Sequence, residues 1–437
     1  MAIPNYPVEF TKDGNVFQAQ QVDRLLQDVG QLSDLLVLSH GWNNDMAEAQ
    51  ALYQTLLGNV SKILDAGILQ GLGGRHFGAM QVFWPSKKFA DEDLIPGGGA
   101  ASATAENDDA LRRLLERMKK DRTRLSDSDH TDPVREANLD AAIALIPNLE
   151  NDPKARHDFV FHLRAILNAS DAHPEDGSLE FFERDPEQLF NNLKDPVIAP
   201  AGTGAGGATA MRAGGAAGLG DLLGGIKAAA RRLANFATYC EMKQRAGTVG
   251  RTGVAQVLLR VRDRKPDLRL HLVGHSFGGR LVTAAAWAMP AGTRQITLTL
   301  LQAAYSHNGL GEKYDGTNNG AFRELLTERR ASGPIVITHT KNDRAVGIAY
   351  PLASRLSRDT AAAMGDENDP YGGMGRNGAQ HTPERDAAAV ELLEVGGNYT
   401  FAPGKVYNLR ADRFITGHSD VTGLQVAYAV LSAARTE

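Results

Sequence analysis

A short motif at a predicted strand-to-helix junction restricts what this chain can fold into. An apolar run that begins at residue 268 ends in Gly274-x-Ser276-x-Gly278, and a helix-compatible run over residues 280–289 follows at once. This order predicts a strand, a sharp turn and a helix, with the serine in a strained backbone position and its hydroxyl pushed outward. The flanking glycines are expected because a Cβ there would collide with the neighbouring helix and strand. The alternative is an ordinary turn whose serine merely caps the helix.

Strand-length apolar runs alternate with helical patterns on both sides of this motif. Further strands are expected at residues 34–40, 77–84, 295–303, 334–339 and 405–409. Helices are expected at residues 46–64, 248–264, 322–330, 345–356 and 418–434. Residues 16–32 fit a strand or a short helix, and residues 360–400 fit a long loop with a possible short helix at 383–393. The alternation predicts an α/β fold whose mostly parallel sheet is covered by helices on both faces.

A long helical stretch interrupts this alternation. Its helices are expected at residues 108–124, 138–146, 159–167 and 221–239. Residues 201–225 are mostly glycine and alanine, which predicts a mobile stretch. We therefore expect residues 1–86 and 236–437 to form the two parts of one core, and residues 87–235 to form an insertion.

Composition restricts the possible partners and compartment. The 437 residues carry a net charge of −5 with 23% charged residues, an ordinary soluble composition without a basic block, so no nucleic-acid partner is expected. Cys240 is the only cysteine, which excludes an intramolecular disulfide and fits a reducing compartment. Neither a signal peptide nor a run of about 18 apolar residues is present, so a cytoplasmic protein without a transmembrane segment is expected. The oligomeric state is left open.

A serine nucleophile needs a base, and the base needs an orienting acceptor. In a parallel sheet these groups gather at the carboxyl ends of the strands. Asp343 directly follows the expected strand at 334–339 and is the first candidate for the acid, although it could instead cap the next helix. Asp412 follows the last strand but lies too near the proposed histidine loop to be preferred. Asp366 and Asp369, in the glycine-rich loop, have the pattern of solvated turn residues.

His418 is the preferred base among four histidines downstream of Ser276. It follows the last strand by a short loop and is expected to open the final helix. His381, in the long loop, is the alternative, whereas His307 and His339 have less positional support. The order Ser276, Asp343, His418 is that of the α/β-hydrolase arrangement.

Two backbone N–H groups are candidates for an oxyanion hole. Phe277 follows the nucleophile at the positive end of the next helix. Trp42 belongs to His40-Gly41-Trp42, which follows the first strong strand. The alternative interpretation of this second segment is a plain turn.

The chain resembles a serine hydrolase of the α/β-hydrolase superfamily, on the lipase and esterase side. The resemblance is carried by His40-Gly41-Trp42, the segment from Gly274 to Gly279, Asn342-Asp343 and Gly417-His418. The resemblance covers residues 34–86 and 235–437. It implies a nucleophile elbow, a catalytic triad of Ser276, His418 and Asp343, and no cofactor. It also implies that a helical insertion forms a cap or lid over the site.

We therefore expect a serine carboxylic ester hydrolase that acts through an acyl-enzyme on a small-molecule or lipid-like ester. One alternative is a lipase or phospholipase in which part of residues 87–235 is a mobile lid. Another is a non-catalytic binding module on a hydrolase scaffold.

Overall fold

A parallel sheet forms the centre of the molecule. The computed structural model describes residues 3–86, 105–195, 225–292, 296–343, 356, 370–387 and 391–436. The sheet has seven strands in the order β1-β3-β2-β6-β7-β8-β9, and every neighbouring pair is parallel. The strands are β1 (Asn5–Glu9), β2 (Asp34–Ser39), β3 (Phe77–Phe83), β6 (Arg269–His275), β7 (Ile296–Leu301), β8 (Ile335–His339) and β9 (Val406–Arg410). The predicted α/β fold with a mostly parallel sheet is confirmed.

The register of the sheet brings the candidate loops to one edge. All six residues of β2 are buried, as expected for a strand covered on both faces. Ser39 at the end of β2 pairs with Gly274 of β6, and His275 pairs with Leu301 at the end of β7. The segments that follow these strands therefore start side by side.

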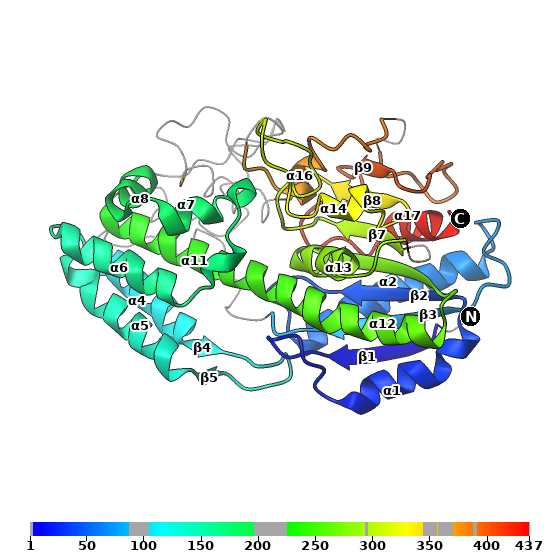
Figure 1. Cartoon of the computed structure of the whole chain (residues 1–437), viewed down its shortest axis with the longest axis horizontal. Helices are drawn as coiled ribbons and strands as arrows, with labels where there is room; N and C mark the ends of the chain where they lie inside the picture. The colour runs from blue at the N-terminus through cyan, green and yellow to red at the C-terminus, as the bar shows by residue number, and fades with distance from the viewer. Residues whose placement is uncertain are drawn as a thin grey trace.

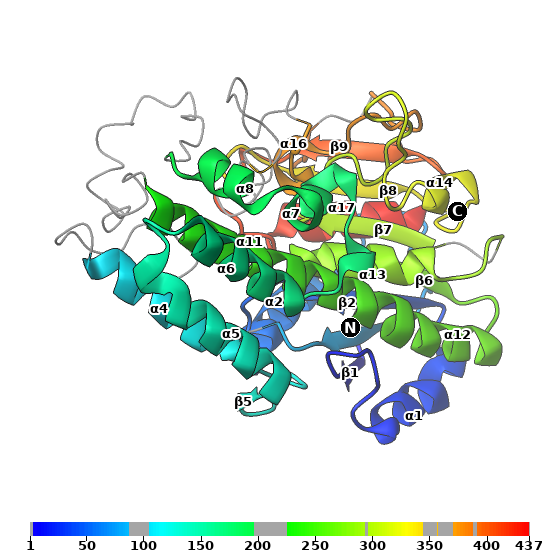
Figure 2. The ribbon, with the colours of Figure 1, turned by 60° about the vertical axis from the view of Figure 1, so that its left-hand side comes forward.

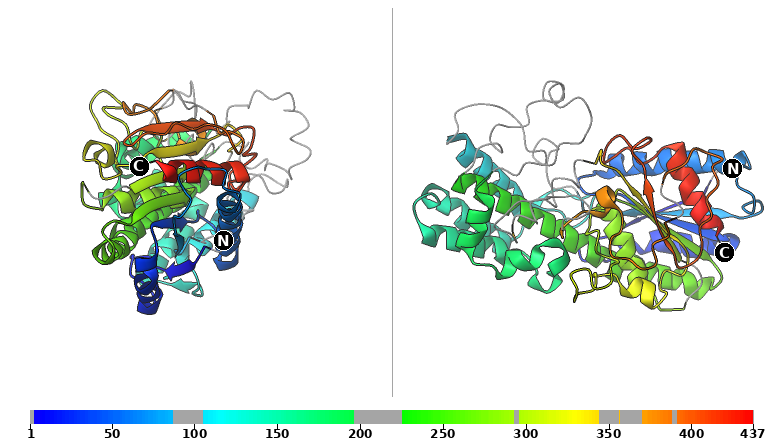
Figure 3. Two further views of the ribbon diagram at one scale, coloured as in Figure 1. Left: turned by 90° about the vertical axis from the view of Figure 1, so that its right-hand side faces the viewer. Right: turned by 90° about the horizontal axis from the view of Figure 1, so that it is seen from above.

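Helices cover both faces of the sheet (Figure 3). One face carries α2 (Met46–Asp65) and α17 (Leu424–Arg435), which pack against each other. The other face carries α1 (Ala19–Asp28), α12 (Ala255–Arg264) and α13 (Phe277–Trp287). Two separate apolar cores result, one on each side of the sheet. Among the described residues, the core also contains the single helical turns α14 (Glu324–Thr327) and α16 (Met374–Asn377).

Between β3 and α12 the chain forms a helical subdomain beside the sheet (Figures 1 and 2). Its helices are α4 (Ala105–Lys119), α5 (Pro133–Leu145), α6 (Pro153–Ala165), α7 (Ser178–Glu183), α8 (Pro186–Leu193) and α11 (Ile226–Thr248). The two-residue strands β4 (Lys120–Asp121) and β5 (His130–Thr131) form a small antiparallel pair. Helix α11 packs against α4, α6 and α8, then continues through a π-helical segment, Val249–Val254, into α12. One continuous helical stretch therefore belongs to both the subdomain and the core.

Buried charged groups join the subdomain to the core. The Arg245 guanidinium donates to the carbonyl of Pro85 at 2.9 Å and to Asp121 at 2.8 Å. Glu175 accepts from the backbone N–H of Ala321 at 2.9 Å. Within the subdomain, Lys243 of α11 forms a buried ion pair with Asp176. Because separated buried charges are costly, these contacts fix the two parts against each other.

Several sequence predictions were wrong at the level of single elements. The final helix begins at Leu424 and not at residue 418, because Asp420 accepts from the backbone and hydroxyl of Thr416 and holds a turn there. Residues 383–387 are not helical, and the helix expected at 322–330 is only the single turn α14.

Other predictions were incomplete or lie outside the described residues. Strand β1 was not expected; its Pro7 is compatible with a strand at the edge of the sheet. Residues 16–32, which fitted either a strand or a short helix, contain helix α1. Except for Leu356, the helix expected at 345–356 lies outside the described residues, as do positions 201–224 of the glycine- and alanine-rich stretch, Asp366 and Asp369. Among the described helices, none combines the length and apolarity needed to cross a membrane.

Candidate active site

Ser276 occupies a sharp turn between β6 and α13. Its backbone angles are φ 56° and ψ −125°, a strained combination for a residue with a side chain. A Cβ on Gly274 would lie 2.3 Å from the carbonyl oxygen of Gly278, and one on Gly278 would lie 2.3 Å from that of Ser39. The predicted strand, turn and helix are therefore present, and the glycines are required by close backbone contacts.

Ser276, His418 and Asp343 form one continuous hydrogen-bonded chain. The His418 Nε2 atom lies 2.8 Å from Ser276 Oγ, and His418 Nδ1 lies 2.8 Å from Asp343 Oδ2. An ionised carboxylate only accepts hydrogen bonds, so Nδ1 carries the proton and Nε2 is left to accept from the serine hydroxyl. Asp343 is fully buried and Ser276 is 4% exposed, whereas the side chain of His418 is 21% exposed.

The other candidate histidines have different partners. His381, the alternative base, lies 2.9 Å from the side-chain oxygen of Asn308 through its Nδ1 atom. The Nδ1 atom of His307 lies 3.2 Å from Asn377 Nδ2. His339 is the last residue of β8. Of the histidines considered in the sequence, His418 is therefore the one that contacts Ser276.

The loop after β2 lies directly against Ser276. A Cβ on Gly41 would lie 2.7 Å from Ser276 Cβ. The Trp42 ring meets the Phe277 ring edge-on, with 5.8 Å between centroids. Phe277 is the first residue of α13, where helix geometry leaves the N–H without an intrahelical acceptor. The structure thus brings both segments that carry the candidate oxyanion donors to Ser276.

His40 anchors this loop from within the core. Its backbone N–H donates to the Tyr53 hydroxyl oxygen at 2.8 Å, and its carbonyl accepts from Trp84 Nε1 at 3.0 Å. Its ring stacks on Trp84 with 5.6 Å between centroids, and Nδ1 lies 2.9 Å from the Gly41 carbonyl. Burial lowers the pKa of His40 to about 4, so it is neutral at neutral pH. In the sequence His40 is visible as part of the His40-Gly41-Trp42 motif, but no signal there indicates this anchoring role.

The loops that carry Asp343 and His418 are tied to each other. Asn342 Nδ2 donates to the carbonyls of Asp412 and Ile415 at 3.1 and 3.0 Å. Asp412 Oδ1 in turn accepts from the backbone N–H of Lys341 at 3.0 Å. Asp412, which was not the preferred candidate for the acid, therefore connects the two loops. The position of Asp412 directly after the last strand was the signal in the sequence that could have indicated this role.

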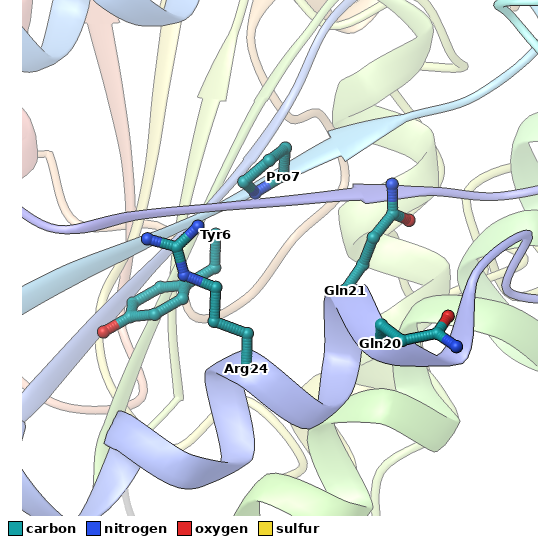
Figure 4. A pocket seen from close by; sticks show the side chains of 5 residues that line it. All are labelled: Tyr6, Pro7, Gln20, Gln21 and Arg24. Carbon is teal, nitrogen blue, oxygen red and sulfur yellow. The ribbon is translucent and has the colours of Figure 1, made fainter.

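Metal-ligand groupings and pockets were sought in the described part of the chain. Within the described ranges, no three His, Cys, Asp or Glu side chains are grouped so that they could hold a metal ion. A surface pocket of about 210 Å³ lies between β1 and α1, lined by Tyr6, Pro7, Gln20, Gln21 and Arg24 (Figure 4). Strands β3 and β2 separate β1 from β6, so this pocket does not belong to the Ser276 site.

Comparisons of the chain with protein-family models, curated proteins and solved structures gave no match. The geometry around Ser276 is therefore the basis on which a function is proposed.

Proposed function

We propose that the protein is a serine carboxylic ester hydrolase with the α/β-hydrolase fold. The observation that carries the proposal is the chain of two 2.8 Å contacts from Ser276 through His418 to Asp343. Such a chain activates a hydroxyl that is otherwise a poor nucleophile at neutral pH. The fold assignment is supported by the parallel sheet and by the positions of the three residues, each of which follows a strand: β6, β8 and β9.

Acylation begins when Ser276 Oγ attacks the ester carbonyl carbon and passes its proton to His418 Nε2. The carbonyl oxygen becomes an oxyanion, which the N–H groups of Phe277 and Trp42 stabilise. Asp343 stabilises the imidazolium without taking its proton. When the tetrahedral intermediate collapses, the bond to the alcohol oxygen breaks and His418 donates its proton to that oxygen. The products of this half-reaction are the free alcohol and an ester of Ser276.

Deacylation repeats the sequence with water as the nucleophile. His418 takes a proton from water, the hydroxyl oxygen attacks the acyl carbon, and the second tetrahedral intermediate forms in the same oxyanion hole. Its collapse breaks the bond to Ser276 Oγ, which recovers the proton from His418. The carboxylic acid leaves and the enzyme returns to its starting state.

The buried contacts between the subdomain and the core favour the esterase over a lipase with a helical lid. Arg245 bonds to Pro85, and Glu175 bonds to the backbone of Ala321, so movement of these helices would separate buried polar partners. No observation on the described residues specifically favours the lipase or phospholipase alternative. A binding module would have no need for the aligned Ser276, His418 and Asp343.

The proposal is tested with Ser276→Ala and a short p-nitrophenyl ester. We expect the variant to lose turnover and to lose labelling by a fluorophosphonate, with an unchanged melting temperature. Ser432→Ala is the control, because Ser432 is also buried but its hydroxyl donates to the backbone carbonyl of Tyr428 within α17. Equal turnover by Ser276→Ala and the wild type would refute the proposed function. Failure of the wild type to react with the probe would support the binding module instead.

A further inference from the structure

His275, the residue before the nucleophile, makes a contact that the mechanism above does not use. Its Nε2 atom lies 2.8 Å from the backbone carbonyl oxygen of His418. The two imidazole rings are 4.9 Å apart between centroids, with an interplanar angle of 45°. His275 is 3% exposed, so this contact is shielded from water. The same strand end therefore carries the nucleophile and a side chain that binds the backbone of the base.

The contact fixes the protonation state of His275. A carbonyl oxygen only accepts, so Nε2 must carry the proton and Nδ1 must be the unprotonated nitrogen. Nδ1 is buried, and none of the described residues forms a hydrogen bond with it. Burial, reinforced by the nearby His418, lowers the pKa of His275 to about 3. His275 thus stays neutral while His418 gains and loses its proton, and it does not compete for that proton.

The backbone of His418 needs such a donor because no helix holds it. The residue lies in the loop between β9 and α17, and α17 begins only at Leu424. Its ring is directed by Asp343 and Ser276, but these contacts do not hold its backbone. The Nε2–H of His275 supplies a direct link from the rigid end of β6 to this loop.

The opposite edge of the His275 ring faces the oxyanion loop. A Cβ on Gly41 would lie 3.1 Å from His275 Nδ1, so the backbone of Gly41 packs closely there. A buried acceptor without a hydrogen bond, such as His275 Nδ1, carries a cost in stability. An apolar side chain of similar size would fill the space beside Gly41 without that cost. Packing alone therefore does not account for a histidine at this position, whereas the bond to His418 does.

We propose that His275 is a positioning residue that sets the place of His418 relative to Ser276 by binding the His418 backbone carbonyl. The inference rests on the proposed function, because it concerns the same reaction. A displacement of about 1 Å in a reacting group can cost about 10²-fold in rate. Loss of this donor is therefore expected to lower kcat far more than it changes KM.

The test compares substitutions that keep or remove a donor at the Nε2 position. The terminal amide nitrogen of Gln lies about as far from Cα as His Nε2 does, whereas that of Asn lies at the position of Nδ1. We expect His275→Leu and His275→Asn to lower kcat about 10- to 100-fold per active site and His275→Gln to recover most of it, with KM little changed. Active sites are counted by titration with a fluorophosphonate, so that loss of folded protein is not mistaken for loss of kcat.

His271→Leu is the matched control. His271 is also a buried histidine of β6, but it bonds to Asp34 and Thr297 toward the other end of the strand. We expect it to lower the melting temperature and to leave kcat per active site unchanged. If His275→Leu does not fold, the comparison of His275→Gln with His275→Asn tests the positioning role. Equal kcat per active site in His275→Gln and His275→Asn would overturn the positioning role, and so would wild-type kcat in His275→Leu. A wild type that neither reacts with the probe nor turns over the ester would instead remove the proposed function.

Discussion

The Thr340 hydroxyl donates to the Asp412 carboxylate at 2.6 Å and so joins the loop after β8 to the loop after β9. The two residues are 72 positions apart in the chain. Asp343 lies three residues beyond Thr340, and His418 lies six residues beyond Asp412. The carboxylate of Asp412 therefore helps to determine whether the acid and the base of the proposed site meet.

We expect Asp412→Ala to lower kcat about 10- to 100-fold, because the Asp343 and His418 loops lose a shared hydrogen-bond acceptor. Steady-state hydrolysis of a short p-nitrophenyl ester measures the effect. Asp315→Ala is the control, since the Asp315 carboxylate is also a hydrogen-bond acceptor, but the backbone N–H groups that donate to it belong to its own turn. Equal kcat in the two variants would contradict a positioning role for Asp412.

Asp343→Asn should lower turnover by about 10³- to 10⁴-fold with little change in structure, because an amide can impose the wrong tautomer on His418. The measurement is kcat for a short ester, together with a circular-dichroism spectrum to show that the fold is kept. Turnover within tenfold of the wild type would show that Asp343 does not orient the base.

Gly41→Ala should lower kcat about 10²-fold, because its Cβ would lie 2.7 Å from Ser276 Cβ and displace the loop that carries Trp42. Gly58→Ala is the control, since Gly58 lies in α2 and a Cβ there meets nothing within 4 Å. That change should leave kcat unaltered and stabilise the protein by up to about 1 kcal/mol. Unchanged activity in Gly41→Ala would exclude close packing of this loop on the nucleophile.

Arg75→Met should make the protein more sensitive to acid. Burial alone would raise the pKa of Asp34, but hydrogen bonds from Arg75 and His271 outweigh burial and hold that pKa below its usual value. Asp34 therefore stabilises the fold above a pH of about 4, and this contribution is lost as the pH falls below that value. Without Arg75 the pKa of Asp34 rises, so the contribution is lost at a higher pH.

The measurements are acid-unfolding midpoints and the free energy of unfolding at pH 7. We expect the midpoint to move to higher pH and the stability at pH 7 to fall by about 3 kcal/mol, because the buried Asp34 carboxylate loses its arginine partner and keeps only weaker hydrogen bonds. Arg410→Met is the control, since Arg410 and its partner Glu391 are both more than half exposed. Such a surface pair contributes at most about 1 kcal/mol. Equal acid midpoints in the two variants would contradict the role of Arg75.

The strands of the sheet interior were predictable because burial on both faces leaves continuous apolar runs, as in β2. Strand β1 was missed because it is short, contains Pro7 and occupies the edge of the sheet. The predicted start of α17 was wrong because the apolar stripe of that helix extends back through Val421, which is buried in the same core but lies in the irregular segment before the helix. A periodic pattern reports burial, and burial does not require a helix.

The sequence by itself pointed to Ser276 as the candidate nucleophile, to Asp343 as the first candidate for the acid and to the need for glycine around Ser276, because these follow from strand ends and local backbone geometry. Only the tertiary structure decided between His418 and His381, whose side chains have the same chemistry. It also revealed the contacts of His275 and Asp412. Those choices depend on how the sheet register and the loop paths bring residues such as Ser276 and His418, 142 positions apart, within hydrogen-bond distance.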